Sequence, residues 1–243
     1  MSEDAVRPED FRRWRAGPLG AITEALEQAL VLRLAGPLAG LRVLDVGCGD
    51  GAYSLAAARR GAQVVGVDAS RPMLTAARVR ANEALLRVEF EHADAAALPF
   101  EEGRFDVALA VTVLCFVPDP AAALREMSRV LAPGGRLVLG ELGRWNAWAA
   151  WRRLRAWHGS QLWRKATFRT AVELRALVRD AGLEAGQVRG AAFYPPLAGA
   201  ASVLAPFDSW LGTLTTFGAA FIAVAAVKPP AGSYTDIDGG GTP

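Results

Sequence analysis

The sequence predicts an α/β fold in which a mostly parallel, doubly wound sheet carries helices on both faces. Three observations support this prediction. Short apolar runs rich in β-branched residues recur along the chain, helix-forming stretches alternate with them, and several runs end in glycine or an acidic residue. Ligands of such sheets bind outside the carboxyl ends of the strands, so the residues that follow each run are the first candidates for a site.

Composition agrees with this fold and argues against several other kinds of protein. The chain has 243 residues, of which 52% are hydrophobic, and this is enough for one large α/β domain or for one domain with an insertion. The net charge of +2 gives no indication of a nucleic-acid partner. Cys48 and Cys115 are the two cysteines and lack the spacing of a disulfide or metal site, and no other cluster indicates a metal.

We expect a cytoplasmic protein without a transmembrane segment. Its first ten residues are acidic and polar, unlike a signal peptide. No uninterrupted apolar run reaches the roughly 18 residues that a membrane span needs.

A helix is predicted over residues 19–34, where Ile22 and Leu26 belong to an apolar set at helical spacing. Residues 1–10 are expected to form a loose arm. Trp14 follows the arm, and it either contacts a ligand or attaches the arm to the domain.

The first strand leads into residues 43–51, VLDVGCGDG, and a helical stretch follows. Strand, glycine turn and helix together present backbone N–H groups to a ligand at the edge of a sheet. Gly47, Gly49 and Ala52 also match a dinucleotide fingerprint. Asp45 favours a cationic ligand instead, because a carboxylate at this position gains nothing beside a pyrophosphate.

A second buried strand is predicted over 63–68 and ends in Asp68, 17 residues beyond Gly51. This is close to the spacing of about 20 residues at which an acidic residue binds a ribose diol. The two carboxylate oxygens of Asp68 suit two vicinal hydroxyl groups. Ser70 is expected to cap a helix that includes Met73.

Three further strands are predicted over 88–91, 105–111 and 136–141. The first of them precedes Asp94. The helix between the last two is expected to begin at Asp119-Pro120, with the acid as N-cap and the proline at the first helical position.

The C-terminal half shows weaker patterns. A capping box over 170–173 predicts a helix as far as Ala181. Strands are expected over 183–190 and 216–227. Residues 193–212 have no clear period, and we expect a loop that breaks the pattern between these strands.

Residues 41–141 resemble the class I S-adenosylmethionine-dependent methyltransferases, and in particular the small-molecule enzymes of menaquinone and ubiquinone biosynthesis. The resemblance implies a Rossmann-like, seven-stranded sheet in the order 3-2-1-4-5-7-6 with an antiparallel last strand. It implies S-adenosylmethionine as cofactor, which carries an ammonium and a sulfonium but no phosphate. The motifs that carry the resemblance are 43–51, Asp68, Phe105-Asp106, Leu114, Asp119-Pro120 and 129–135.

The resemblance implies that the cofactor lies across the ends of the first four strands. Asp94 is then near the adenine amino group, and Ala95 lies beside the ring. The residues that we expect at the cofactor are Asp45, Gly47, Cys48, Gly49, Asp68, Ala69, Met73, Asp94, Ala95 and Val111.

No catalytic residue follows from the sequence. Relatives commonly have two histidines where this chain has Cys115-Phe116, so a role resting on them does not carry over. Glu141, His158 and Tyr194 are titratable candidates near the expected acceptor, although each is more typical of a structural or solvated polar residue.

Residues 143–168 hold five tryptophans, and 142–172 contain seven basic residues and no acidic one. We interpret this segment as a lid that packs on the domain. Trp145, Trp148 and Trp151 step by three, so successive rings drift by about 60° around a helix and do not separate from the basic residues. A membrane-surface helix is one alternative. Nucleic-acid binding is another, but it lacks a recognisable module.

The sequence therefore predicts a methyltransferase that uses S-adenosylmethionine on a small acceptor, either apolar or a soft nucleophile. A phospholipid or membrane-associated acceptor is the first alternative, and a non-catalytic S-adenosylmethionine-binding regulator is the second. We expect one domain over 1–228 with the lid inserted at about 143–168, and a disordered tail over 229–243. Peripheral membrane contact and the oligomeric state are left open.

Overall fold

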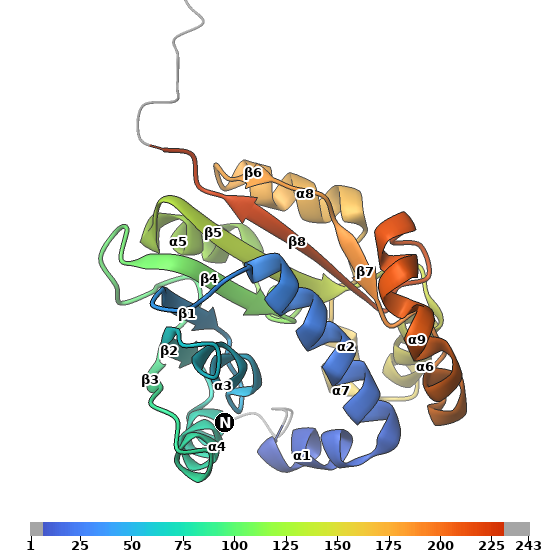
Figure 1. The fold of residues 1–243 in the computed structure, drawn as a ribbon. Coiled ribbons are helices and arrows are strands. Elements are labelled where there is room, and N and C mark those ends of the chain that lie inside the picture. Colours follow the sequence, from blue (N-terminus) through green and yellow to red (C-terminus); the bar gives the residue numbers. More distant parts are fainter. Residues whose placement is uncertain (1–6, 231–243) are drawn as a thin grey trace, which may run out of the picture.

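The computed structural model describes residues 7–230 and confirms the α/β fold (Figure 1). The strands are β1 (Arg42–Val46), β2 (Gln63–Asp68), β3 (Glu89–His92), β4 (Phe105–Val111), β5 (Leu131–Leu142), β6 (Glu184–Ala185), β7 (Arg189–Ala191) and β8 (Phe221–Val227). They form one sheet in the order β3-β2-β1-β4-β5-β8-β6, and β7 also pairs with β8. The first five strands are parallel, and β8 runs antiparallel to β5.

The expected strand order is confirmed, but the predicted strand over 183–190 is two short strands. Both β6 and β7 pair antiparallel with β8, so they share one position at the edge of the sheet. At Gly186, between them, a Cβ would lie 2.9 Å from the carbonyl oxygen of Ala225, which already accepts a hydrogen bond from the Gly186 N–H. The last strand begins at Phe221 rather than at residue 216.

The caps that the sequence predicts are present in the structure. Asp119 Oδ1 accepts a hydrogen bond from Ala122 N at 2.9 Å, and Thr170 and Glu173 form a capping box. The helices are α1 (Pro8–Ala16), α2 (Pro18–Ala35), α3 (Ala52–Ala58), α4 (Arg71–Glu83), α5 (Pro120–Val130), α6 (Ala147–Trp157), α7 (Gln161–Lys165), α8 (Ala171–Asp180) and α9 (Ala198–Leu214).

Both ends of the chain lie partly outside the residues that the structure describes. Residues 1–6 of the expected arm lie outside the described residues, and from Pro8 the chain is helical. Proline at the first helical position and acidic residues in the first turn favour this helix start. Residues 231–243 of the expected tail also lie outside the described part.

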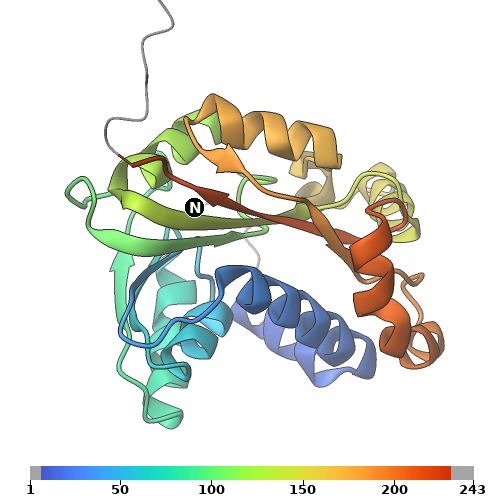
Figure 2. The same cartoon turned by 45° about the horizontal axis from the view of Figure 1, so that its top comes forward.

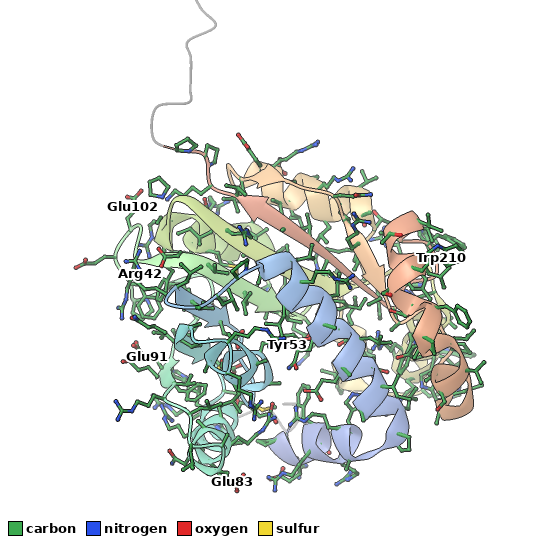
Figure 3. All side chains as sticks on the ribbon, viewed as in Figure 1. Arg42, Tyr53, Glu83, Glu91, Glu102 and Trp210 are labelled. Atoms are coloured by element: carbon green, nitrogen blue, oxygen red, sulfur yellow. The ribbon has the colours of Figure 1, made fainter. Side chains whose placement is uncertain are left out.

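Helix α9 replaces the loop that was expected over 193–212. Its inner side carries Ala201, Asp208 and Gly212 instead of large apolar residues, so the sequence shows no inward apolar stripe. The Asp208 carboxylate accepts hydrogen bonds from the backbone N–H groups of residues 192 and 193 at 3.1 and 2.9 Å. A large residue, Trp210, lies instead on the outer side of α9 (Figure 3).

Two apolar cores fill the two faces of the sheet, with α2 and α3 over one face and α5 and α8 over the other (Figure 2). In β1, Val43 belongs to the core beneath α2 and α3, whereas Leu44 belongs to the core beneath α5 and α8. Successive strand residues point to opposite faces, so strands buried on both sides are continuously apolar.

A buried ion pair joins the end of β5 to two neighbouring segments. Glu141 is fully buried and accepts hydrogen bonds from Leu114 N at 2.9 Å and from Arg169 Nη1 at 3.0 Å. Arg169 Nη2 in turn donates to Leu114 O at 3.2 Å. Glu141 was a titratable candidate in the sequence, and its contacts are those of a structural residue that holds the chain after β4.

We expect Arg169→Met to lower the free energy of unfolding by about 3–5 kcal/mol, because it leaves the Glu141 carboxylate buried without a counter-ion. Urea denaturation measures this loss. Arg144→Met is the control, since its pair with Glu173 is partly exposed and should contribute about 0–1 kcal/mol. Equal losses in both variants would contradict a special role for the buried pair.

Candidate functional site

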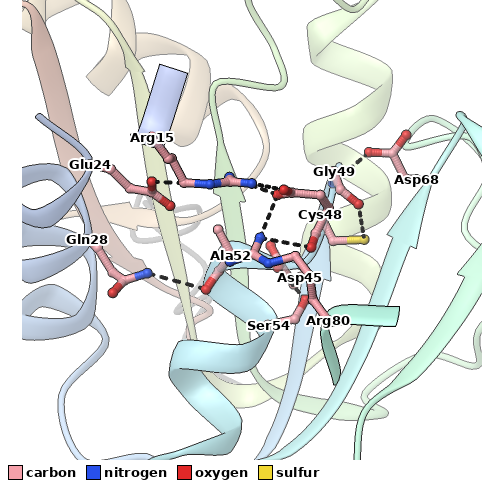
Figure 4. A network of polar contacts seen from close by, with 11 residues as sticks. Arg15, Glu24, Gln28, Asp45, Cys48, Gly49, Ala52, Ser54, Asp68 and Arg80 are labelled. Atoms are coloured by element: carbon pink, nitrogen blue, oxygen red, sulfur yellow. Dashed lines mark hydrogen bonds and ion pairs between the residues drawn. The ribbon is translucent and has the colours of Figure 1, made fainter. Parts of the chain in front are cut away.

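The glycine loop, residues 47–51, connects β1 to α3 at the carboxyl edge of the sheet (Figure 4). Gly47 has φ +66°, and a Cβ there would lie 2.4 Å from Val113 Cγ2, so its lack of a side chain serves packing. Gly49 has φ +54°, and a Cβ there would meet no atom within 4 Å. The backbone at Gly49 therefore borders open space in which a ligand can approach it.

Asp68 holds the glycine loop from the end of β2. Its Oδ2 accepts a hydrogen bond from Gly49 N at 2.8 Å, and its Oδ1 accepts one from Ser70 N at 2.7 Å. Burial raises the pKa of Asp68, and these two backbone hydrogen bonds oppose the rise. Each oxygen keeps a second lone pair for a ligand hydroxyl. The sequence indicated a ligand-binding acid, and the structure adds a role in shaping the loop.

Asp45 lies on β1 beside α3 and is 2% exposed. Its Oδ2 accepts a hydrogen bond from Ser54 Oγ at 2.6 Å. Burial raises the pKa of Asp45 to about 7, although the hydrogen bonds from Ser54 oppose this effect. A buried carboxylate without a neighbouring cation is stabilised by a positively charged ligand nearby.

The remaining expected residues end β4 or follow the ends of β1, β2 and β3 in the chain. Asp94 and Ala69 are exposed, and Asp94 Oδ1 accepts a hydrogen bond from Ala96 N at 2.9 Å. The expected residues that are buried and apolar are Cys48, Met73, Ala95 and Val111. All ten expected residues thus belong to the carboxyl ends of the first four strands or to the segments that leave them.

Thr112 follows Val111 and was not expected at the site. Its φ of 53° is in the left-handed region, which a β-branched residue rarely adopts. Its N–H donates to Gly140 O at 2.7 Å, which holds the strained turn in place. Such strain is concentrated at functional sites, and no feature of the sequence indicates it.

Asp50 of the glycine loop ties three helices together and was also not expected. Arg15 of α1 forms a two-pronged ion pair with its carboxylate, in which Nη1 donates to Oδ1 at 3.0 Å and Nη2 donates to Oδ2. Arg80 of α4 lies 2.9 Å from the same Oδ1, and Arg15 Nε lies 3.6 Å from Glu24 of α2 (Figure 4). Helix α1 is thereby attached over the loop.

A second polar group lies between α2 and α6. The Arg152 guanidinium stacks on the rings of Trp148 and Trp163, at 5.1 and 4.9 Å from their centroids. Among residues 7–230, Arg152 Nη1 and Trp148 Nε1 are buried without a hydrogen-bond partner. Burial raises the pKa of Glu27 on α2 to about 7, against the opposing effect of the positive charge on Arg152.

One pattern in the sequence places Glu27 on the inner face of α2. Glu27 lies four residues after Thr23, which is buried, so both belong to one face of α2. Trp14 was given two interpretations, and its contact supports attachment of α1 to the domain. Its ring packs edge-on against Trp148 with centroids 5.7 Å apart. Tyr194 is structural too, because its hydroxyl lies 3.0 Å from Thr23 Oγ1.

The charges at the glycine loop indicate which ligand the site fits. Arg15 and Arg80 are both engaged by Asp50, whereas Asp45, Asp68 and Asp94 have no ion pair among residues 7–230. Carboxylates accept hydrogen bonds from hydroxyl and amino groups and attract cations, but they repel phosphates. The site therefore fits a cationic nucleoside such as S-adenosylmethionine and does not fit a pyrophosphate.

Along residues 7–230, no helix combines the length and the apolar character needed to cross a membrane. The same residues contain no group of three histidine, cysteine or acidic side chains arranged to hold a metal ion.

Known proteins resemble this chain. A family described as a methyltransferase domain matches residues 44–139. A ubiquinone biosynthesis O-methyltransferase of Ruegeria pomeroyi is 39% identical over 166 residues, which are 65% of this chain and 66% of that protein. Its namesake in Xanthomonas euvesicatoria pv. vesicatoria is 36% identical over 184 residues, or 73% and 76% of the two chains.

A solved structure resembles the chain over most of its length. It is an S-adenosylmethionine-dependent methyltransferase of Thermotoga maritima, described as a possible histamine N-methyltransferase. It superposes with a TM-score of 0.69 and 26% identity, and the match covers 90% of this chain and 95% of that one.

Asp68→Asn should weaken binding of S-adenosylhomocysteine by about 1.5–3 kcal/mol, because it removes the charge from the acceptor of ligand hydroxyls. Calorimetric titration measures the affinity. Asp106→Asn is the matched control, since Asp106 pairs with Arg42 at the opposite end of the strands. If the folded Asp68 variant bound as tightly as the control, the assignment of Asp68 to the ligand would be wrong.

Affinity for S-adenosylmethionine should rise roughly tenfold from about pH 5.5 to about pH 7.5, because the cation binds the ionised form of Asp45 more tightly. Titration calorimetry across this range tests the prediction, and Asp45→Asn should remove this part of the pH dependence.

The pH dependence of the free energy of unfolding has the opposite sign. A carboxyl whose folded pKa is raised stabilises the ligand-free protein most at low pH, and this contribution is lost as the pH rises towards 7. An unchanged pH profile in the variant would contradict the role of Asp45.

Proposed function

This chain belongs to the class I S-adenosylmethionine-dependent methyltransferases, and we propose that its acceptor is a small, largely apolar compound methylated on a hydroxyl oxygen. The relatives from Ruegeria and Xanthomonas are named as O-methyltransferases of ubiquinone biosynthesis, which favours a hydroxylated quinone precursor. The observation that carries the proposal is the group formed by Glu27, Trp148 and Arg152, where buried hydrogen-bond donors without partners accompany a carboxyl with a raised pKa.

We assign the cofactor to the carboxyl edge of β1 to β4. In this assignment Asp68 accepts hydrogen bonds from the ribose hydroxyls, and Asp94 accepts one from the adenine amino group. Gly49 leaves room for the ligand beside the backbone, and Asp45 provides negative charge beneath it. When bound, S-adenosylmethionine supplies a methyl group on a positively charged sulfur, which leaves as a neutral thioether after in-line attack.

The acceptor would lie between this edge and the roof formed by α1, α2 and α6. Buried donors without a partner cost free energy, and an acceptor oxygen would satisfy them. Arg152 Nη1 and Trp148 Nε1 are therefore suited to bind a hydroxyl oxygen or the phenolate that it forms. The rings of Trp14 and Trp163 beside them supply apolar surface for the remainder of the acceptor.

Glu27 is our candidate for the general base. A hydroxyl group must lose its proton when its oxygen is methylated, and the Glu27 carboxylate would accept that proton. A base with a pKa near the working pH is the most effective, which agrees with the value of about 7 for Glu27. A thiol acceptor would need this base less. Glu27 therefore favours a hydroxyl acceptor over the soft nucleophile that the sequence also allowed.

A lipid-borne acceptor is the second candidate. It is favoured by a large exposed apolar surface on α6 and α9, next to the proposed roof. Both candidates share the same hydroxyl chemistry and differ in the tail that the acceptor carries.

Glu27→Gln should reduce kcat for phenolic acceptors by about a hundredfold or more, because it removes the base, while the affinity for S-adenosylhomocysteine stays the same. The assay measures S-adenosylhomocysteine production over phenols, catechols, thiols and amines. For the wild type, kcat/KM should rise with pH through about 7 as Glu27 ionises, and this rise should be absent from the variant.

Glu83→Gln is the matched control, since Glu83 is an exposed carboxylate on α4. Turnover of thiols alone, or equal activity of Glu27→Gln and the control on phenols, would refute the proposed oxygen chemistry.

A further inference from the structure

The outer side of α9 is an exposed apolar stripe. Val203, Phe207, Trp210 and Leu214 follow one another at spacings of four, three and four, which places them on one face of a helix. Their side chains are between 58% and 68% exposed. A soluble helix normally presents polar residues on such a face, so this stripe indicates a surface with a binding role.

The orientation of α9 is determined by its inner side and not by the stripe. Asp208 receives two backbone hydrogen bonds from residues 192 and 193. Gly212 lies against the neighbouring chain so closely that a Cβ would be 2.2 Å from Gly190 O. Rotating α9 to bury Phe207 or Trp210 would break the hydrogen bonds of Asp208 and move Gly212 away from Gly190. The apolar stripe is therefore held facing outward.

Helix α6 extends the same surface. Both views of the fold show α6 and α9 side by side at one end of the molecule (Figures 1 and 2). The chain after α9 is bonded to the start of α6, where Gly218 N donates to Trp145 O at 3.0 Å and Asn146 Nδ2 donates to Ala219 O at 2.7 Å. Large exposed side chains continue across this junction and along α6, namely Phe217, Trp145, Trp151, Leu154 and Trp157.

The charges around this surface are of one sign. Residues 142–172, which include α6 and α7, contain seven basic residues and no acidic one. Arg153, Arg155 and Arg164 among them are exposed. From residue 190 to residue 227 the one charged side chain is Asp208, which is buried beneath α9. The α6–α9 surface thus combines exposed aromatic and aliphatic residues with arginines.

We infer that the α6–α9 surface docks onto an anionic lipid bilayer, with the aromatic residues entering the interface and the arginines contacting lipid phosphates. Tryptophan and phenylalanine on an apolar face beside basic residues are the composition of interfacial helices. A second copy would be a poorer occupant, because a two-fold symmetric contact would bring this arginine-rich region close to its own copy. A bilayer supplies both the apolar layer and the negative charge.

The tryptophan-rich segment contributes to both the interior and this surface. The angular drift of its tryptophans argued for a lid packed on the domain. The structure divides them, since Trp148 is buried and Trp151 and Trp157 are exposed. The exposed apolar residues therefore come from two neighbouring helices, and the second of them, α9, was not expected from the sequence.

The test is co-sedimentation of the full chain with phosphatidylcholine vesicles, with and without roughly 30% phosphatidylglycerol, at about 0.1 M salt. We expect the wild type to sediment with the anionic vesicles and to be released by high salt. Phe207→Gln/Trp210→Gln should weaken binding at least tenfold. Arg155→Gln/Arg164→Gln should weaken it by roughly 30-fold, as two basic residues near an anionic surface would.

Two matched controls carry equal changes on other faces. Val79→Gln/Val172→Gln alters two exposed valines of α4 and α8, and Arg125→Gln/Arg179→Gln removes two exposed arginines of α5 and α8. Both should bind vesicles like the wild type. All variants should bind S-adenosylhomocysteine and turn over a water-soluble acceptor normally, so failure of docking is distinguishable from failure of the proposed reaction.

Three results would overturn the inference. One is a wild type that stays in the supernatant with anionic vesicles, and another is an equal loss of binding in the controls. The third is a wild-type dimer in sedimentation equilibrium that Phe207→Gln/Trp210→Gln dissociates while vesicle binding is absent, which would assign the surface to a second copy.

Discussion

Hydrogen bonding of carboxylates to the glycine loop is the constraint on which the site depends. Gly49 has no side chain and its backbone borders open space, so this turn needs support from outside the loop. Asp68 supplies that support from the neighbouring strand by accepting the Gly49 N–H. Asp50 then attaches α1 and α4 to the loop through Arg15 and Arg80. One short segment thereby sets the position of the first two strands, their helices and the N-terminal helix.

Buried polar groups in this protein differ in whether they have hydrogen-bond partners. Glu141 is buried, but Arg169 and Leu114 N satisfy it, so it holds the chain after β4. Arg152 Nη1 and Trp148 Nε1 are buried without such partners among residues 7–230. The free-energy cost of leaving these donors unsatisfied would be recovered if the proposed acceptor oxygen bound there. That difference is why the proposed acceptor site lies between α2 and α6.

Helix α9 packs on the domain with its inner side and exposes large apolar residues on its outer side. The inner side of α9 uses a small residue and an acid to bind neighbouring backbone, which leaves its large apolar residues outside. A bilayer would cover these residues and give a tail-bearing acceptor a short path to the roof. In this proposal a polar acceptor site adjoins an apolar approach from the bilayer, and none of the helices within residues 7–230 is long and apolar enough to cross a membrane.

The sequence by itself determined the parallel sheet, the glycine loop, the place of Asp68 at the end of the second strand and the caps at Asp119 and Thr170, because these depend on local patterns and short spacings. Tertiary structure alone decided the split of the strand over 183–190, the presence of α9 and the contacts of Glu27 and Arg152. Each of these depends on residues far apart in the chain: Gly186 with Ala225, Asp208 with Ala192, and α2 with α6. Local periodicity carries no information about such partners, and for α9 it was misleading because the large residues face outward.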